Sequence, residues 1–162
     1  MTQPITIRPP ELGDARSLVR NHHNYNLKEW EDKLRELIQA QEEGKLVCVV
    51  AWQEHQVIGL ATLEKPQAFA FTKEDNFAHR RQFYAMGCRA QDAYPLLLDA
   101  CVAHCREHEP GVKIITANTL LGRNSGIRLL RKLGFRPYGK LKGGVQFGSA
   151  TQDEALLALE IK

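Results

Sequence analysis

Strand-like and helix-like segments are interleaved along the whole chain, and their order restricts the fold to a mixed sheet covered by helices. Short alternating or valine-rich runs predict strands, whereas apolar residues three and four positions apart predict helices. The expected order is β-α-α-β-β-β-α-β-α-β-β. This order predicts a fold of the α/β class, of the α+β type, with a mixed sheet. Strands are expected at residues 5–8, 45–52, 57–63, 80–86, 113–117, 136–142 and 155–161, and helices at 12–19, 94–109 and 125–133. A further helix, which carries Trp30 to Ile38 and ends near residue 44, is expected after a polar link at residues 21–26. Residues 64–79, which include Phe69, Phe71 and Phe77, have no clear period and are expected to be irregular and partly buried.

The chain has the size and composition of one globular domain over residues 1–162. Hydrophobic residues make up 43% and charged residues 25%, and no run approaches the roughly 18 apolar residues of a membrane helix. The net charge of +3 is spread along the chain, so neither nucleic acid nor a membrane is an expected partner. The first residues lack the basic start and apolar run of a signal peptide, and a cytoplasmic location is therefore expected.

The cysteines fall mainly inside apolar runs, which is typical of reduced thiols packed as small hydrophobic side chains. They are Cys48, Cys88, Cys101 and Cys105. Cys101 and Cys105 are four residues apart on an expected helix, as are His104 and His108, and this spacing can place two metal ligands on one face. Because the two cysteines continue an apolar stripe, core packing is favoured over a zinc site, and no metal is expected.

The most specific motif lies at residues 124–139, where a helix begins at Asn124-Ser125 and ends in Leu133-Gly134-Phe135 before a strand. A glycine in the left-handed conformation followed by an apolar residue is a favoured helix end. Together with the order of elements, this segment resembles the GNAT superfamily of acyl-CoA-dependent N-acetyltransferases, and residues 145–153 look most like its phosphinothricin acetyltransferase branch. The resemblance implies the GNAT fold, acetyl-CoA as co-substrate and direct attack on it by a primary amine of a small molecule.

The resemblance places the loop that binds the coenzyme A pyrophosphate at the start of the long helix. The loop residues are Arg89, Ala90, Gln91, Asp92, Ala93 and Tyr94. Relatives carry glycines where this chain has Asp92 and Tyr94, so the loop is degenerate, because side chains there crowd the approaching phosphates. At about 5 Å and an effective dielectric near 20, the Asp92 charge would cost an anion on the order of 3 kcal/mol, or about a hundredfold in affinity. The alternative is that Asp92 and Pro95 only start a helix, with the Asp92 carboxylate capping its first N–H groups.

The resemblance assigns further coenzyme A contacts to other parts of the chain. The backbone of Tyr84, Ala85 and Met86 is expected to bind the pantetheine arm and polarise the thioester carbonyl, which does not depend on side-chain identity. The side chains of Asn118 and Asn124 are expected to contribute as well.

A general base is needed to deprotonate the acceptor ammonium, and Glu74 or His79 lies where the family commonly has one. The alternative is a solvated turn around Glu74 and a surface histidine at 79. His22 and His23, in a polar link between two helices, are the next candidates. Relatives often have a tyrosine at the position of Leu130, where it protonates the leaving thiolate, and leucine cannot do so.

Two functions therefore compete. The first is acetyl transfer from acetyl-CoA to a small-molecule amine. The second is a catalytically silent GNAT-fold module that binds a ligand or a protein, which the altered loop and Leu130 favour. The oligomeric state, monomer or homodimer, stays open.

Overall fold

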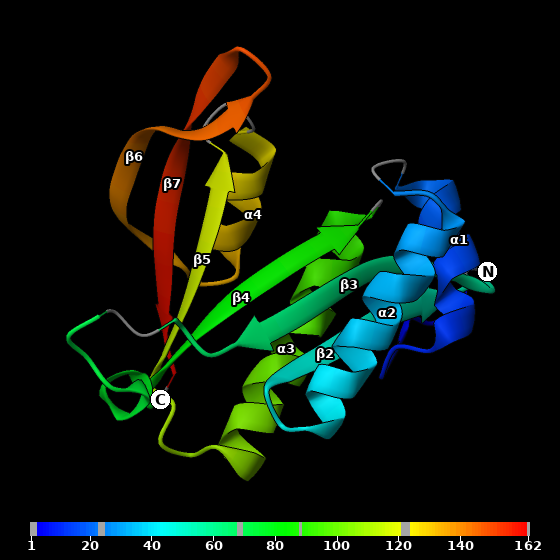
Figure 1. Ribbon diagram of the computed structural model, residues 1–162, viewed down its shortest axis with the longest axis horizontal. Helices are drawn as coiled ribbons and strands as arrows, with labels where there is room; N and C mark the ends of the chain where they lie inside the picture. Colours follow the sequence, from blue (N-terminus) through cyan, green and yellow to red (C-terminus); the bar gives the residue numbers. More distant parts are fainter. Residues whose placement is uncertain (1–2, 23–24, 68–69, 88, 121–123, 162) are drawn as a thin grey trace. The chain divides into compact units, whose positions relative to one another are not determined.

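The computed structural model describes residues 3–22, 25–67, 70–87, 89–120 and 124–161 (Figure 1). Its strands and helices follow the predicted order, with two short 3₁₀ turns added at Leu12–Asp14 and Glu74–Phe77. The strands are β1 (Thr6–Arg8), β2 (Leu46–Gln53), β3 (Gln56–Glu64), β4 (Arg80–Gly87), β5 (Ile114–Leu120), β6 (Arg136–Phe147) and β7 (Ala150–Glu160). The helices are α1 (Ala15–Asn21), α2 (Leu27–Glu42), α3 (Ala90–His108) and α4 (Asn124–Lys132).

The strands form a mixed sheet in the order β1-β2-β3-β4-β5-β7-β6. The described pairs of β1 with β2, β2 with β3, β5 with β7 and β6 with β7 are antiparallel. β4 and β5 are parallel, and their described register covers Arg80 to Gln82 only, opposite Ile114 to Thr116. The chain divides into two compact units, residues 1–65 with 84–109 and residues 66–83 with 110–162, so β4 contributes to both.

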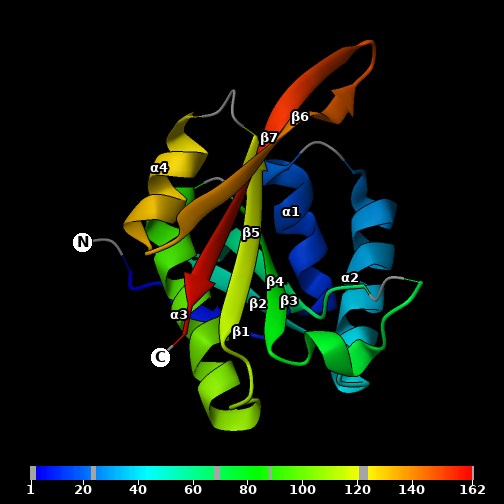
Figure 2. The same ribbon diagram turned by 90° about the vertical axis from the view of Figure 1, so that its left-hand side faces the viewer.

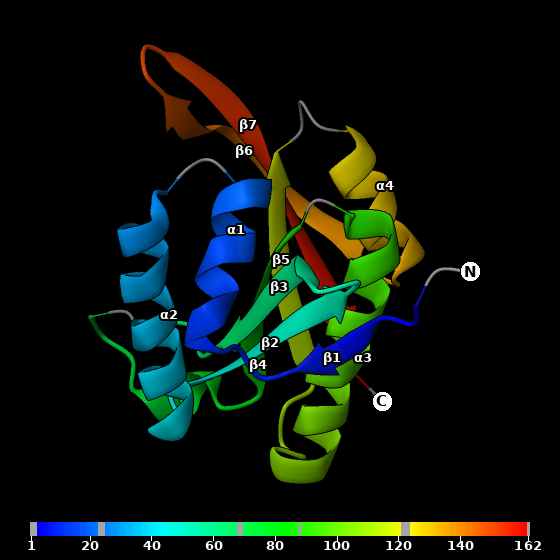
Figure 3. The same ribbon diagram turned by 90° about the vertical axis from the view of Figure 1, so that its right-hand side faces the viewer.

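The first unit has helices on both faces of β1, β2 and β3, with α1 and α2 on one face and α3 on the other (Figure 3). Leu18, Trp30 and Leu34 form a buried cluster with Val50 and Leu60. The α2 helix begins at Leu27, directly after the predicted polar link at residues 21–26, and the Asn26 carboxamide oxygen accepts the Glu29 N–H at 2.9 Å as an N-cap.

The second unit is built on β5, the long β6–β7 ribbon and α4, which packs against β5. The ribbon extends past the end of β5 (Figure 2), and β6 and β7 are longer than predicted. The predicted end of α4 is confirmed. Gly134 has φ +100°, and the Phe135 N–H donates to the Leu130 carbonyl at 3.1 Å. The Phe135 ring then stacks on Phe83 at 6.4 Å between centroids.

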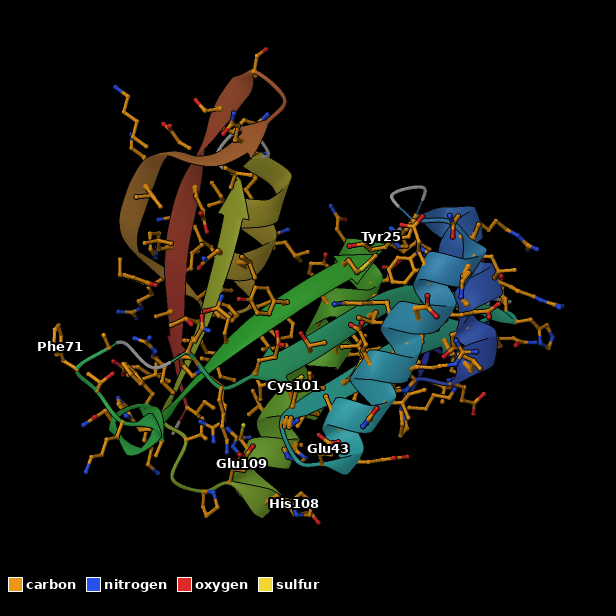
Figure 4. The ribbon with its side chains drawn as sticks, viewed as in Figure 1. Tyr25, Glu43, Phe71, Cys101, His108 and Glu109 are labelled. Atoms are coloured by element: carbon orange, nitrogen blue, oxygen red, sulfur yellow. The ribbon has the colours of Figure 1, made fainter. Side chains whose placement is uncertain are left out.

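One local expectation is wrong, and another holds only in part. The α3 helix begins at Ala90, four residues before the predicted start, so Pro95 lies inside it. Proline is favoured in a first turn, and that preference misplaced the boundary. In the irregular segment before β4, Phe71 is fully exposed (Figure 4), since no core faces it, while Phe77 is half-buried and Phe69 lies outside the described residues. No helix in the described part of the chain is long and apolar enough to cross a membrane.

Candidate functional site

The segment that the resemblance assigns to coenzyme A lies at the start of α3, directly after β4. Arg89 is the N-cap residue of the helix, and its side chain makes no capping hydrogen bond. The Arg89 carbonyl accepts the backbone N–H groups of Asp92 at 3.1 Å and Ala93 at 2.9 Å. Asp92 is therefore the third residue of the helix and not its N-cap, and the capping role expected for its carboxylate is wrong.

The Asp92 carboxylate instead pairs with the guanidinium group of Arg89. Asp92 Oδ2 lies 2.8 Å from Arg89 Nη2 and 3.1 Å from Nε. Arg89 Nη1 donates to Oε1 of Gln53, a buried side chain at the end of β2. Asp92 thus occupies the arginine that an anion would use here, and it places a negative charge in the first turn of the helix, whose amino end is the second positive group. An incoming phosphate has to displace Asp92 from Arg89 as well as tolerate its charge.

Two glycines outside the loop let the backbone segments of the first unit approach closely. A β-carbon on Gly59 would lie 2.9 Å from Cβ of Ala93, so the first turn of α3 rests directly on β3. A β-carbon on Gly87 would lie 2.5 Å from the carbonyl oxygen of Ile58. Neither glycine was singled out from the sequence. Their position in dense apolar runs, where glycine weakens a strand, is the signal that could have identified them.

Tyr94 links α3 to β4. Its hydroxyl donates to the Ala85 carbonyl at 2.9 Å, and burial raises the pKa of the phenol. The ring therefore holds the strand whose backbone is expected to bind the pantetheine arm. In the first unit, Ala85 and Arg89 therefore lie close to residues 92–94, at the end of β4.

The other predicted residues of this loop and strand differ in exposure. Tyr84 is 52% exposed, Met86 packs against the buried cluster and Ala93 is fully buried. Gln91 is exposed, and the side chain of Ala90 lies outside the described residues.

The remaining predicted site residues belong to the second unit. The Asn118 amide donates to Oε1 of Glu154 at 2.5 Å, a contact that no sequence pattern indicated. Asn124 is the first residue of α4, and its side chain is outside the described residues. Glu74 starts a 3₁₀ turn, with its side chain likewise undescribed. His79 is exposed, and its carbonyl accepts the N–H groups of Lys113 at 2.8 Å and Ile114 at 3.1 Å. The roles expected for these four residues stay predictions.

The structure describes two of the three remaining candidates, His22 and Leu130. His22 is half-buried, its carbonyl accepts the indole N–H of Trp30 at 3.3 Å, and its ring lies edge-on to Trp30. His23 lies outside the described residues. Leu130 is buried in the core of its unit at 6% exposure, so this position packs the core and supplies no proton donor.

The described cysteines, Cys48, Cys101 and Cys105, are buried. Cys101, on α3 (Figure 4), and Cys48 are fully buried, and burial raises the pKa of each thiol to about 12. Cys105 is buried and forms no disulfide, and Cys88 lies outside the described residues. The His104 and His108 rings lie 4.9 Å apart. Within the described residues, no three histidine, cysteine or carboxylate side chains are grouped as a metal site.

A surface cavity of about 470 Å³ lies in the second unit, between the turn after α4 and the β6–β7 ribbon. Arg136, Tyr138 and Glu160 line it, and none of the predicted site residues does. Because the residues assigned to coenzyme A lie elsewhere, we place the candidate site at the start of α3.

No protein-family model matches the chain, and no curated protein matches it in sequence. Solved structures match it over nearly the whole length. A ribosomal-protein-alanine N-acetyltransferase from Brucella melitensis has a TM-score of 0.78 at 22% identity, covering 96% of this chain and 99% of its own. A putative acetyltransferase from Salmonella typhimurium, solved with acetyl-CoA, has a TM-score of 0.75 at 18% identity, covering 99% and 95%. A chimeric spermidine N-acetyltransferase from Vibrio cholerae has a TM-score of 0.72 at 15% identity, covering 98% and 96%.

All three are named as acetyltransferases, one of them as putative, and the match over nearly the whole length shows that this chain has their fold. None of the three belongs by its name to the phosphinothricin branch, which stays a prediction. The fold of this chain is that of the GNAT N-acetyltransferases.

Proposed function

We propose that this chain is an N-acetyltransferase that moves an acetyl group from acetyl-CoA to a primary amine of a small molecule. The observation that supports this proposal most directly is the position of residues 89–94, at the start of the 19-residue helix α3 and directly after β4. The chain that carries this segment matches structures named as acetyltransferases over 96% or more of its length. A helix amino end after a central strand is suited to an anionic ligand. A cytoplasmic location belongs to the same proposal, since none of the described cysteines forms a disulfide.

In this reaction, acetyl-CoA supplies a thioester carbonyl that an unprotonated amine can attack. A base of the chain, Glu74 or His79, accepts the proton that the acceptor ammonium must lose. The second product is the coenzyme A thiol, and Leu130 gives it no proton, so solvent or another group supplies that proton. The phosphates are held by Arg89 once Asp92 has been displaced from it, which implies weaker binding than in a glycine-rich loop.

The direct test is a calorimetric titration of the purified protein with acetyl-CoA, followed by an assay of thiol release with a panel of primary amines. A dissociation constant in the micromolar range together with amine-dependent thiol release is expected. Absence of binding at millimolar acetyl-CoA would refute the proposal.

The second candidate, a silent module, is favoured by the Arg89–Asp92 pair. With Asp92 in place, the arginine already has an anionic partner and needs no ligand. The two candidates separate in the Arg89→Gln variant. The enzyme should lose at least about tenfold in acetyl-CoA affinity, as expected for loss of a charged hydrogen bond to phosphate. A silent module shows no change, because it has no affinity to lose.

A further inference from the structure

The sheet of the second unit has one apolar face and one polar face. On the apolar face, Phe83 stacks on Phe135, which follows the end of α4 in the chain. Ile115, Ala117 and Leu157 are buried on the same face. Side chains of a strand alternate between faces, so Gln82, Thr116, Asn118 and Glu154 share the opposite face. The contacts agree with this assignment. Thr116 Oγ1 donates to Gln82 Oε1, and Asn118 Nδ2 donates to Glu154 Oε1, both at 2.5 Å.

Glu154 is held in place on this face. Asn118, from the neighbouring strand β5, fixes one carboxylate oxygen. On the other side, β6 bulges between Leu141 and Val145 and presents Gly144. A β-carbon there would lie 3.0 Å from Oε2 of Glu154 and 3.1 Å from its Cβ, so the glycine leaves the space that the Glu154 side chain occupies.

The charge of Glu154 has no cationic partner among the described residues. The nearest ion pair on the ribbon joins Lys140 to Asp153, at 4.0 Å, and the Gly143 N–H also goes to Asp153, at 2.9 Å. The half-buried carboxylate of Glu154 therefore accepts one neutral amide hydrogen bond and keeps the remaining oxygen available. A carboxylate in this state attracts a cation.

A second polar group on the same face lacks a partner. Gln82 Nε2 is buried and makes no hydrogen bond with any described residue, although its carboxamide oxygen is bound by Thr116. Buried amide groups are nearly always hydrogen-bonded, so an unpaired one suggests a partner that arrives with a ligand. Thr116 and Asn118 are two residues apart, or about 7 Å along β5, so one small ligand can reach both groups if its cation meets the Glu154 carboxylate and a hydrogen-bond acceptor, such as a carbonyl oxygen, meets Gln82 Nε2.

We infer that Glu154, positioned by Asn118, binds the ammonium group of the acetyl acceptor. This inference rests on the proposed function and adds the residue that recognises the acceptor. Glu154 binds the charged form of the amine, and the proton is then lost to the base considered above. The shared chemistry is a primary ammonium, which a small diamine or the first residue of a polypeptide can supply.

The test uses 1,4-diaminobutane and L-alaninamide as probes, the second standing for a polypeptide amino end. Binding is followed by ¹H–¹⁵N amide shifts of the full chain, which needs no turnover. The expected result is that Glu154→Gln weakens binding of at least one probe about tenfold, the usual size of a charged hydrogen bond to a partly buried partner. Asn118→Ala should weaken the same probe less. Whichever probe responds identifies the source of the ammonium.

The matched control is Glu160→Gln, the same chemical change on the same strand and face but six residues, or about 20 Å, away. It should leave binding of both probes unchanged. In turnover assays, Glu154→Gln should raise KM for the amine with little change in kcat and leave acetyl-CoA affinity intact. If kcat falls at constant KM, or if Glu160→Gln weakens binding equally, the ammonium role of Glu154 is refuted. If the probes bind through Glu154 while acetyl-CoA does not bind, the proposed acetyl transfer fails and this site stands.

Discussion

At the scale of single residues, Asp92 has the largest expected effect on the affinity of this loop for an anion. The sequence indicated a charge that repels phosphate, and the structure adds that the same carboxylate neutralises Arg89. Both effects weaken anion binding, but the second can be reversed by removing one side chain. The surface ion pair itself contributes little stability, at most about 1 kcal/mol, because both partners are substantially exposed.

We predict that Asp92→Gly binds acetyl-CoA more tightly, by about tenfold to a hundredfold at low salt, since it removes the repulsion and frees Arg89. The gain should shrink as salt screens the exposed charges. Calorimetric titrations at two salt concentrations measure both effects. Asp92→Asn separates charge from backbone freedom, because it keeps the shape of the side chain. Unchanged affinity in both variants at low salt would mean that this loop is not a phosphate site.

Tyr94→Gly, which the sequence favours as a second way to open the loop, has a different expectation once Tyr94 is seen to hold Ala85. The change removes a largely buried ring and its hydrogen bond, so it should destabilise the first unit by about 3 kcal/mol or more. Any gain in coenzyme A affinity is then offset by unfolding. The conservative Tyr94→Phe should cost only about 1 kcal/mol. Urea unfolding of the two variants tests the difference, and equal stability of the two would contradict it.

At the scale of elements, the close approach of β4 and α3 to β3 depends on glycines. Gly87 meets the carbonyl of Ile58, and Gly59 meets Ala93. Backbone oxygen atoms cannot move aside as a flexible side chain can, so the Gly87 contact is the stricter of the two. This packing fixes where α3 starts and therefore where its amino end points within the first unit.

Gly87→Ala should destabilise the protein by about 2 kcal/mol or more, because the new methyl group overlaps the Ile58 carbonyl oxygen. The matched control is Gly111→Ala, in the loop after α3, where an added β-carbon meets nothing within 4 Å. That variant should be neutral or slightly stabilising, since alanine restricts the unfolded chain. Chemical denaturation of the two variants compares them directly, and equal stability would show that β4 moves away from Ile58 at no cost.

At the scale of the whole molecule, the buried thiols link stability to pH. Burial raises the pKa of Cys48 and Cys101 from 9.0 to about 12 in the folded chain. The unfolded chain releases these protons first as pH rises above about 9, whereas the folded chain keeps them until about 12. The contribution of each thiol is therefore fully present below pH 9 and lost between these two values.

We predict that the free energy of unfolding falls as the pH rises from about 9 towards about 12, with a slope approaching about 1.4 kcal/mol per pH unit for each thiol. Urea midpoints across this range measure the slope. Cys101→Ala should reduce it, even though its absolute stability is lower because of the smaller side chain. A slope that is the same in the variant would exclude Cys101 as a source. Slow alkylation of the native thiols at pH 8 is a second expectation.

The sequence by itself determined the order of the elements and the end of α4. Periodicity reports which face of a helix or strand is apolar, and Gly134-Phe135 reports a local backbone requirement, so both are readable from short segments. The start of α3 is local too, but Pro95 favours a later start than the one observed, and the hydrogen bonds to the Arg89 carbonyl place it at Ala90.

Only the tertiary structure decided the partners of the candidate site residues. Gln53 meets Arg89 across 36 residues of chain, and Asn118 meets Glu154 across another 36. Such contacts depend on sheet register and on the bulge at Gly144, and a shift of one residue would turn these side chains to the opposite face. The sequence could therefore name Arg89, Asp92 and Asn118, while their electrostatic partners follow from long-range packing that no local pattern encodes.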